Sequence, residues 1–376
     1  MKHMKQDIVG LVYTGERLDE LQELTRWRAA AALPMVGRYR LIDFVLASLI
    51  HSDIRNIGII MQKNYHSLMD HLGSGREWNL HGKRSGLTIL PPYMSRENVG
   101  VYEGLLDALH TNINFMRKST ERFIAVTDSN VLYRVDFSDV VRQHVQNKAD
   151  ITLVYTRDRN ARRNGSGRYL QIEDGLVTRM EFDPTIPHYE NTYIGAFLVR
   201  RELLIDMTDR AVASGQHHFS RDMLSQMVAE RVYRVNGYEC PGRIWMIDSV
   251  GSYYQANMDF LNDEFRAQVF HDGQPVWTKL RDEMPARYMG DSHVSNALVA
   301  DGCLIEGAVI NSILFRGVVV KPGAVIRNSI IMQDAVISRG VEVENCILDK
   351  QTTLRDNVRL IAPRNHPIVI AKNLTI

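Results

Sequence analysis

The chain has 376 residues, of which 45% are hydrophobic, and its 45 Lys and Arg residues nearly balance its 44 Asp and Glu residues. This length predicts two domains, and the balanced charge excludes a general attraction to nucleic acid or anionic membranes. Three cysteines without metal-binding spacing, a polar N-terminus and the lack of any apolar run of about 20 residues predict a cytoplasmic protein.

Residues 1–267 alternate short apolar runs with helical patterns. Strands are predicted at 8–13, 54–61, 122–127 and 150–155, and helices at 40–50, 101–115 and 136–147. Such alternation indicates an α/β, Rossmann-like domain built of βαβ units around a mainly parallel sheet. Ligands bind such sheets beyond the carboxyl ends of the strands, so the residues that follow Tyr13, Met61 and Val126 are candidates for a site.

Residues 268–290 contain two prolines and lack periodicity, which predicts a linker. In residues 291–376 aliphatic residues recur at every sixth position, as in Val325, Ile331, Ile337 and Val343. This period indicates a left-handed parallel β-helix of hexapeptide repeats, whereas an ordinary antiparallel β domain, the alternative, shows a period of two. We expect the coil to serve as a scaffold and oligomerisation element rather than as an active site.

Four segments resemble motifs of the glucose-1-phosphate adenylyltransferase (ADP-glucose pyrophosphorylase) family. They are residues 37–55 (G-R-Y-R-L-I-D-F at their start), 102–108 (Y-E-G-L-L-D-A), 218–222 (H-F-S-R-D) and 245–251 (W-M-I-D-S-V-G). The resemblance covers nearly the whole chain and implies a nucleotidyltransferase domain followed by a left-handed β-helix. In that family a sugar phosphate attacks the α-phosphorus of ATP and pyrophosphate leaves.

This reaction requires a glycine-rich loop after the first strand, cations on the phosphates and Mg²⁺ held by carboxylates. Of the family's three loop glycines only Gly15 remains. When Arg17 is aligned with the family's loop arginine, Tyr13 stands where bare backbone must approach the phosphates.

Two lysines that the family uses are also missing. The family's R-A-K-P stretch corresponds to Arg28 and the alanines after it, so Ala30 replaces one lysine, and Asp183 stands in place of the other. Losing one such charge costs about 10²- to 10³-fold in rate. Arg17, Arg28 and Ala30 therefore mark a degenerate catalytic site.

Other site residues persist. The resemblance implies that Asp128 and Asp248 are possible Mg²⁺ ligands if any nucleotide is bound, and the alternative is that each caps a loop or helix. It also implies remnants of the nucleotide and sugar sites at Gly15, Gly104, Asp107, Gly195, His218 and Asp222. A loop rich in arginine is interpreted as a surface loop or, alternatively, as an anion site or subunit contact, and its arginines are Arg157, Arg159, Arg162, Arg163 and Arg168.

A retained scaffold with an eroded phosphate site resembles the GlgD-type subunit of that family. The resemblance implies a regulatory role in glycogen biosynthesis and a hetero-oligomer, a tetramer, with a catalytic ADP-glucose pyrophosphorylase subunit. Arg38 and Arg40 match the family's activator site and are expected to bind a phosphorylated sugar effector, unless they are solvated arginines packed on neighbouring loops. An active glucose-1-phosphate adenylyltransferase and a stand-alone sugar-phosphate or nucleotide sensor remain as alternatives.

Overall fold

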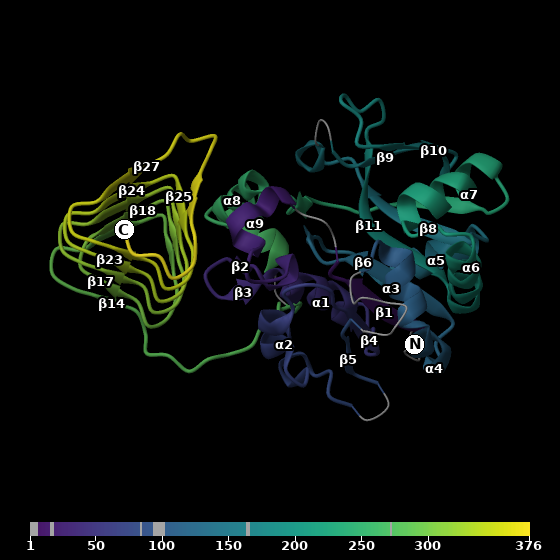
Figure 1. The fold of residues 1–376 in the computed structure, drawn as a ribbon, viewed down its shortest axis with the longest axis horizontal. Coiled ribbons are helices and arrows are strands. Elements are labelled where there is room, and N and C mark those ends of the chain that lie inside the picture. The colour runs from purple at the N-terminus through teal and green to yellow at the C-terminus, as the bar shows by residue number, and fades with distance from the viewer. Residues whose placement is uncertain (1–6, 16–18, 83–84, 93–101, 163–165, 271–272) are drawn as a thin grey trace. The chain divides into compact units, whose positions relative to one another are not determined.

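Figure 1 shows a computed structural model that describes residues 7–15, 19–82, 85–92, 102–162, 166–270 and 273–376. The chain forms two compact units that do not follow the order of the sequence. Unit 1 comprises residues 1–17 and 44–246, and unit 2 comprises residues 18–43 and 247–376. Among the described residues, every helix is too short or too polar to cross a membrane.

A mixed sheet forms the centre of unit 1. Within the described residues its strand order is β5-β4-β1-β6-β11-β8-β12-β10-β9. The strands are β1 (Ile8–Tyr13), β4 (Ile57–Ile60), β5 (Leu87–Leu90), β6 (Phe123–Asp128), β8 (Ile151–Thr156), β9 (Arg168–Glu173), β10 (Leu176–Phe182), β11 (Asn191–Arg200) and β12 (Val235–Glu239). The predicted strands at 8–13, 122–127 and 150–155 are confirmed within one residue, and the one predicted at 54–61 is shorter.

The sheet is parallel only in part. β5, β4, β1 and β6 run parallel, as predicted, but β11 runs antiparallel to both of its neighbours, β6 and β8. β9 and β10 form a hairpin whose two-residue turn, Asp174 and Gly175, has φ of 49° and 79°, as a type I′ turn requires. β8 and β12 also pair in parallel, so antiparallel pairing within the described part of this sheet is confined to the contacts of β10 and β11, and the sheet is mixed.

Helices cover this sheet. They are α1 (Leu41–His51), α2 (His66–Leu72), α3 (Leu105–Thr111), α4 (Ile113–Lys118), α5 (Phe137–Gln146), α6 (Arg201–Ala213) and α7 (Ser225–Glu230), together with the π-helical turn η5 (Phe219–Leu224). The predicted helices at 40–50 and 136–147 are confirmed as α1 and α5. The single helix predicted at 101–115 is wrong: Asn112 separates α3 from α4, and its side chain donates to the carbonyl oxygen of Ala108 at 2.8 Å.

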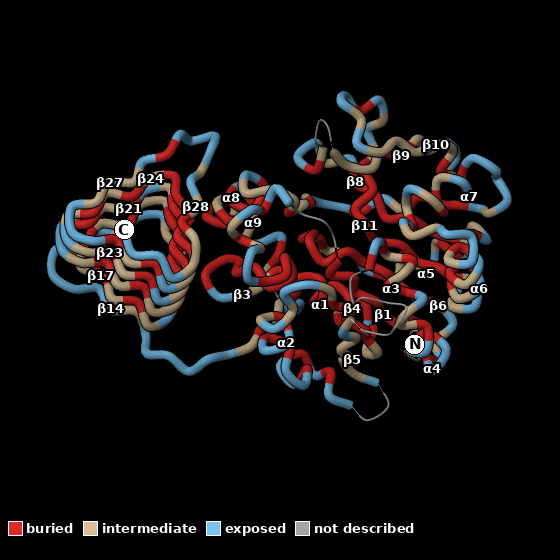
Figure 2. Tube along the Cα trace, viewed as in Figure 1, coloured by how far each residue is buried: buried red, intermediate tan, exposed pale blue. Residues whose placement is uncertain are grey.

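The core of unit 1 lies along the sheet. Every residue of β1, β6 and β8 is buried, as the red segments in Figure 2 show. Strands buried on both faces have continuous apolar runs rather than alternating ones, and for this reason the runs were visible in the sequence. Asp128 ends the buried run of β6, so a carboxylate stands at the carboxyl end of a central strand.

A parallel β-helix dominates unit 2. Within the described residues each of its three faces is a sheet of five parallel strands. The strands of the first face are β14 (Arg287–Tyr288), β17 (Leu304–Ile305), β20 (Val319–Val320), β23 (Val336–Ile337) and β26 (Thr353–Leu354). Those of the second are β15 (His293–Ser295), β18 (Ala308–Ile310), β21 (Val325–Arg327), β24 (Glu342–Glu344) and β27 (Arg359–Ile361). Those of the third are β16 (Leu298–Val299), β19 (Ile313–Leu314), β22 (Ile330–Ile331), β25 (Cys346–Leu348) and β28 (Ile368–Ile370).

The predicted six-residue period is confirmed, since Val325, Ile331, Ile337 and Val343 lie on successive faces. The first coil strand begins at Arg287, so the predicted linker of residues 268–290 extends four residues too far.

One corner of the coil is built from asparagine. Asn311, Asn328 and Asn345 have φ of 47°, 45° and 54°, a left-handed conformation that asparagine adopts more readily than most residues. The side-chain amide of Asn311 donates to the side-chain oxygen of Asn328 at 2.6 Å, which ties one coil to the next.

Two further segments complete unit 2, although the sequence assigned both to the first domain. One carries η1 (Asp19–Thr25), η2 (Ala30–Ala32), β2 (Pro34–Met35) and β3 (Tyr39–Arg40), and the other carries α8 (Val250–Asp259) and α9 (Asp263–Val269). Asn257 accepts from the backbone N–H of Val36 at 3.0 Å, and the hydroxyl of Tyr254 donates to the carbonyl oxygen of Asn328 in the coil. These contacts place residues 19–43 and 247–267 with the coil rather than with the central sheet.

Candidate functional site

The segment after β1 is occupied by the side chain of Tyr13. This residue is buried, and its hydroxyl donates to the carbonyl oxygen of Gly15 at 3.2 Å. A Cβ atom on Gly15 would lie 2.5 Å from the Tyr13 hydroxyl oxygen and 2.6 Å from Oε1 of Gln62. The space beside this glycine is therefore filled by the protein itself. Arg17 lies outside the described residues.

Asp128 stands at the carboxyl end of β6, the strand next to β1. It is buried, and its Oδ2 accepts a hydrogen bond from Nη2 of Arg168 at 2.7 Å. Burial raises the pKa of the Asp128 carboxyl group, and the charge of Arg168 opposes that rise. The predicted metal ligand is therefore half of an ion pair.

Gly195 of β11 lies directly against this pair. Its φ is 77°, and a Cβ atom there would lie 2.0 Å from Oδ2 of Asp128 and 2.9 Å from Nη2 of Arg168. The position therefore requires glycine both for its backbone conformation and for the close approach of a carboxylate. The structure thus brings two predicted site residues, Gly195 and Asp128, into contact.

Sequence reasoning placed Arg168 in a surface loop, but it is the first residue of β9, and its side chain is 25% exposed. Its guanidinium Cζ lies 4.7 Å from the ring centroid of Tyr193, and Nη1 donates to Oγ of Ser220 at 3.3 Å. Arg163, which the sequence grouped with it, lies outside the described residues.

The motif segments at 102–108 and 218–222 meet at the start of α3. Gly104 precedes this helix, and a Cβ atom there would lie 2.3 Å from the carbonyl oxygen of His217, so only glycine fits. Asp222 accepts from the backbone N–H groups of His217 and His218 at 3.1 and 2.9 Å. These hydrogen bonds give Asp222 a structural role in holding its own segment.

Asp107 pairs with His217, a residue that sequence reasoning did not select. The Oδ1 of Asp107 lies 2.6 Å from Nδ1 of His217, and this hydrogen bond raises the pKa of His217. With Glu103 they form a group whose potential ligand atoms lie within 4.8 Å of one another. Three such ligands suffice geometrically for a divalent cation, although exposed groups of this kind commonly bind none.

An acid, Asp183, occupies the position where the family resemblance implies the second lysine. Asp183 has φ of 47°, accepts from the backbone N–H of Gly167 at 2.9 Å and pairs with Arg221 at 2.8 Å. It therefore organises the loop between β10 and β11 rather than offering a cation to a phosphate.

Asp248 belongs to unit 2 and precedes Ser249, the N-cap residue of α8. Its backbone N–H donates to Oγ of Ser252 at 3.0 Å, and Ser249 and Ser252 form a capping box at the start of that helix. The backbone of Asp248 thus takes part in a helix cap. The two predicted metal ligands belong to different compact units, Asp248 to unit 2 and Asp128 to unit 1.

Arg28 and Ala30, the predicted remnants of a catalytic stretch, are buried in unit 2. Nη2 of Arg28 donates to both carboxylate oxygens of Asp349, at 2.8 and 2.9 Å, and Nη1 contacts the sulfur of Met332 at 3.8 Å. The side chains of this pair are 4% and 1% exposed. Arg28 therefore links residues 19–43 to the coil and does not present its charge to a ligand.

The positive charge of Arg40 acts on another cationic side chain of unit 2, that of Lys350. Burial, followed by the charges of Arg40, Arg28 and Lys372, lowers the pKa of Lys350 to about 7, and only Asp349 opposes the shift. Cationic side chains that lower one another's pKa do so by mutual repulsion, and a bound anion would relieve that repulsion. Lys350 was not found from the sequence because it lies in an ordinary coil turn.

Arg38 faces different partners. Arg38 is exposed in the turn before β3. Burial, followed by the charge of Arg281 and to a smaller extent that of Arg38, lowers the pKa of Arg316. The two predicted effector residues, Arg38 and Arg40, thus contribute to the electrostatics of different side chains, Arg316 and Lys350.

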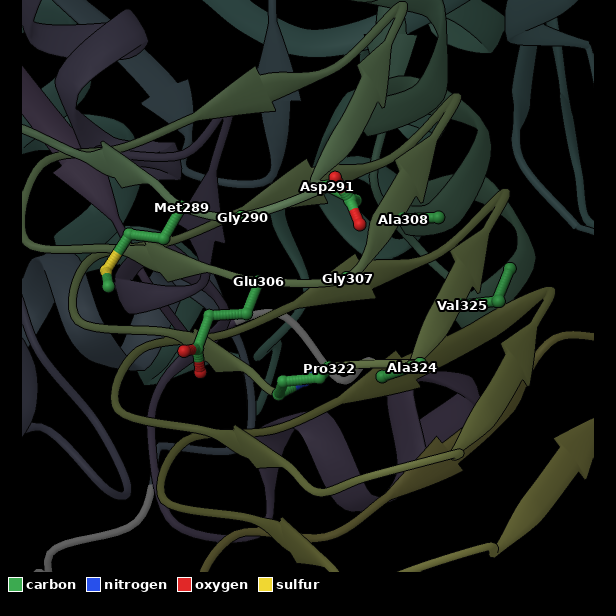
Figure 3. Close-up of a pocket in the computed structure, with 10 residues that line it drawn as sticks. Met289, Gly290, Asp291, Glu306, Gly307, Ala308, Pro322, Ala324 and Val325 are labelled. Atoms are coloured by element: carbon green, nitrogen blue, oxygen red, sulfur yellow. The ribbon is translucent and has the colours of Figure 1, made fainter.

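A pocket of about 570 Å³ lies at one corner of the coil (Figure 3). It spans three successive turns, and its ionisable lining residues are Asp291 and Glu306, of which Glu306 pairs with Lys321 at 3.3 Å. Its acidic lining is unsuited to a phosphate, so it is not a candidate for the effector site.

Comparison with known proteins shows which families and which individual proteins the chain resembles. A model of the nucleotidyl transferase family matches residues 14–263, and a model of the GlmU-like C-terminal hexapeptide region matches residues 284–361. Glycogen biosynthesis protein GlgD of Bacillus subtilis (strain 168) is 34% identical over 94% of this chain and 92% of its own length. Glucose-1-phosphate adenylyltransferase of Thermomicrobium roseum is 34% identical over 94% of this chain and 83% of its own length. These matches confirm the predicted fold class.

Proposed function

The chain belongs to the nucleotidyl transferase family, in the group that includes GlgD and the glucose-1-phosphate adenylyltransferases, and from this premise we propose that it is a regulatory, catalytically deficient subunit of ADP-glucose pyrophosphorylase. It acts in glycogen biosynthesis in the cytoplasm, where it modulates a catalytic partner subunit within a hetero-oligomer. The observation that carries this proposal is the ring of Tyr13 packed against Gly15.

A phosphate-binding loop works by presenting bare backbone N–H groups to an anion. The Tyr13 side chain instead fills the space beside Gly15 and hydrogen-bonds to its carbonyl oxygen at 3.2 Å. Two further losses support the proposal, because Ala30 and Asp183 stand where the family resemblance implies lysines. Each lost cation lowers the rate of phosphoryl chemistry by about 10²- to 10³-fold.

The purified chain alone is expected to release pyrophosphate from ATP and glucose 1-phosphate at least about 10⁴-fold more slowly than ordinary enzymes, because two cations are missing. The assay is run beside the Thermomicrobium roseum enzyme under identical conditions. A turnover of about 1 s⁻¹ for this chain would overturn the proposal.

Partnership is tested by co-expression with a catalytic adenylyltransferase chain, followed by native mass measurement of the complex. A mixed oligomer whose response to a phosphorylated sugar differs from that of the catalytic chain alone is the expected result. Failure to associate, with phosphorylated sugars still bound by this chain, would favour the stand-alone sensor.

An active adenylyltransferase is the second candidate, and the retained carboxylates Asp128 and Asp248 favour it. This alternative predicts micromolar binding of ATP that depends on Mg²⁺. Isothermal titration of the chain with ATP, with and without Mg²⁺, separates the two candidates.

We further propose that Arg40, Lys350 and Lys372 bind the anionic group of an effector. Because the pKa of Lys350 is lowered to about 7, this side chain is largely neutral at pH 8 and largely protonated at pH 6. Sulfate, whose charge is constant over this range, is therefore expected to bind about tenfold more tightly at pH 6 than at pH 8, in step with the protonated fraction.

The matched control is Lys350→Arg, which keeps a cation at the site at both pH values. It is expected to bind sulfate with little dependence on pH. Equal affinities of the unmodified chain at pH 6 and pH 8, measured by calorimetry, would contradict the assignment of Lys350 to the anion site.

A further inference from the structure

The family resemblance implies that Asp128 holds a magnesium ion, but the surroundings of this carboxylate do not fit one. Magnesium requires near-octahedral coordination by oxygen atoms at about 2.0–2.1 Å. Here the nitrogen Nη2 of Arg168 lies 2.7 Å from Oδ2 of Asp128. A fixed positive charge at that distance opposes the approach of a second cation to the same oxygen.

We propose that the guanidinium group of Arg168 permanently takes the place of a divalent cation at Asp128. The ion pair then neutralises a buried carboxylate without any metal, so the end of β6 is electrostatically complete in the isolated chain. This inference concerns cation binding rather than turnover, and it does not depend on the regulatory role proposed above.

Three contacts hold Arg168 in this position. Besides Asp128, the guanidinium contacts Oγ of Ser220 at 3.3 Å and lies over the ring of Tyr193, with Cζ 4.7 Å from its centroid. Tyr193 is 1% exposed, so this aromatic surface is fixed within the core. An arginine with a carboxylate, a hydroxyl and a ring as partners is oriented in advance and loses little freedom when it pairs.

The neighbouring glycine keeps the two groups together. The atoms that would crowd a Cβ of Gly195 are Oδ2 of Asp128 at 2.0 Å and Nη2 of Arg168 at 2.9 Å. Both charged groups therefore occupy the volume that a side chain on β11 would take. Tight packing around a charged pair favours one arrangement, so we expect the pair to persist when divalent cations are present.

The test uses Mn²⁺ as the probe and counts bound ions by electron paramagnetic resonance on the full chain. The unmodified chain and Asp128→Asn are expected to bind the same number of Mn²⁺ ions. Arg168→Ala is expected to gain one Mn²⁺ site at Asp128, because the repelling charge is gone. The affinity for Mn²⁺ at this position should be at least about tenfold higher than in the unmodified chain. The double variant Arg168→Ala with Asp128→Asn should lose that site again.

Arg168→Lys is the matched control, since it keeps the charge and should gain no site. Mn²⁺ bound at Glu103, Asp107 and His217 is common to all these variants and cancels in the comparison. If Arg168→Ala fails to fold, Arg168→Gln, which retains polar contacts, replaces it. Loss of a bound ion from the unmodified chain on Asp128→Asn substitution would overturn the proposal, as would a folded neutral variant that gains no site.

Discussion

Replacing Arg28 with alanine is expected to lower the free energy of unfolding of unit 2 by about 3–5 kcal/mol, because the change leaves the Asp349 carboxylate buried without its charged partner. The two side chains are 4% and 1% exposed, and the pair is bidentate at 2.8 and 2.9 Å. Urea denaturation followed by fluorescence measures the loss, with Trp27 and Trp277 reporting from unit 2.

Two variants test whether the loss comes from the unpaired charge. Arg359→Ala removes a coil ion pair whose side chains are 67% and 40% exposed, so it is expected to cost about 0–1 kcal/mol. The double variant Arg28→Met with Asp349→Asn removes both charges and keeps an acceptor for the backbone N–H of Lys350, which donates to Asp349 at 2.7 Å. This double variant should recover part of the stability that Arg28→Ala loses. A loss below about 1 kcal/mol for Arg28→Ala would show that the pair is not structurally important.

The fold was predictable where its signals are local. The buried strands β1, β6 and β8 are continuous apolar runs, and the coil repeats its aliphatic positions along the chain. The grouping of residues 19–43 with the coil was not predictable. It rests on contacts such as the one between Arg28 and Asp349, which lie 321 residues apart, and no periodicity reports a pairing at that distance.

In the candidate site, too, some residues were predictable from the sequence and others were not. Gly104 and Asp107 were found because they stand in a recognisable motif, and Asp128 because it follows a predicted strand. The role of Arg168 was missed because the sequence grouped it with Arg157, Arg159, Arg162 and Arg163, and only the packing of β9 against β11 distinguishes it.

The partner of Asp107 was also missed. His218 was selected from the sequence and its neighbour His217 was not, yet the structure joins His217 to Asp107, 110 residues away. A motif thus identified the carboxylates, but the side chains that neutralise them came from segments that carry no motif.

Substitution of Gly195 by alanine is expected to lower the free energy of unfolding of unit 1 by about 2–5 kcal/mol. A left-handed backbone costs an alanine about 1–2 kcal/mol, and overpacking adds about 1–3 kcal/mol, because the new methyl group would lie 2.0 Å from Oδ2 of Asp128. Gly215→Ala is the matched control. Its φ of 72° imposes the same backbone cost, but nothing lies within 4 Å of its Cβ position, so only about 1–2 kcal/mol should be lost.

The comparison also tests the ion pair, because Arg168 holds the carboxylate that the methyl group must displace. If Asp128 is fixed by Arg168, then Gly195→Ala and Arg168→Ala disturb the same contact, and their effects on unfolding cannot add. The double variant should therefore lose less than the sum of the two single variants by about 0.5–3 kcal/mol, the range found for residues in direct contact. Additive losses, or equal losses for Gly195→Ala and Gly215→Ala, would mean that Asp128 moves aside freely and that Arg168 does not hold it.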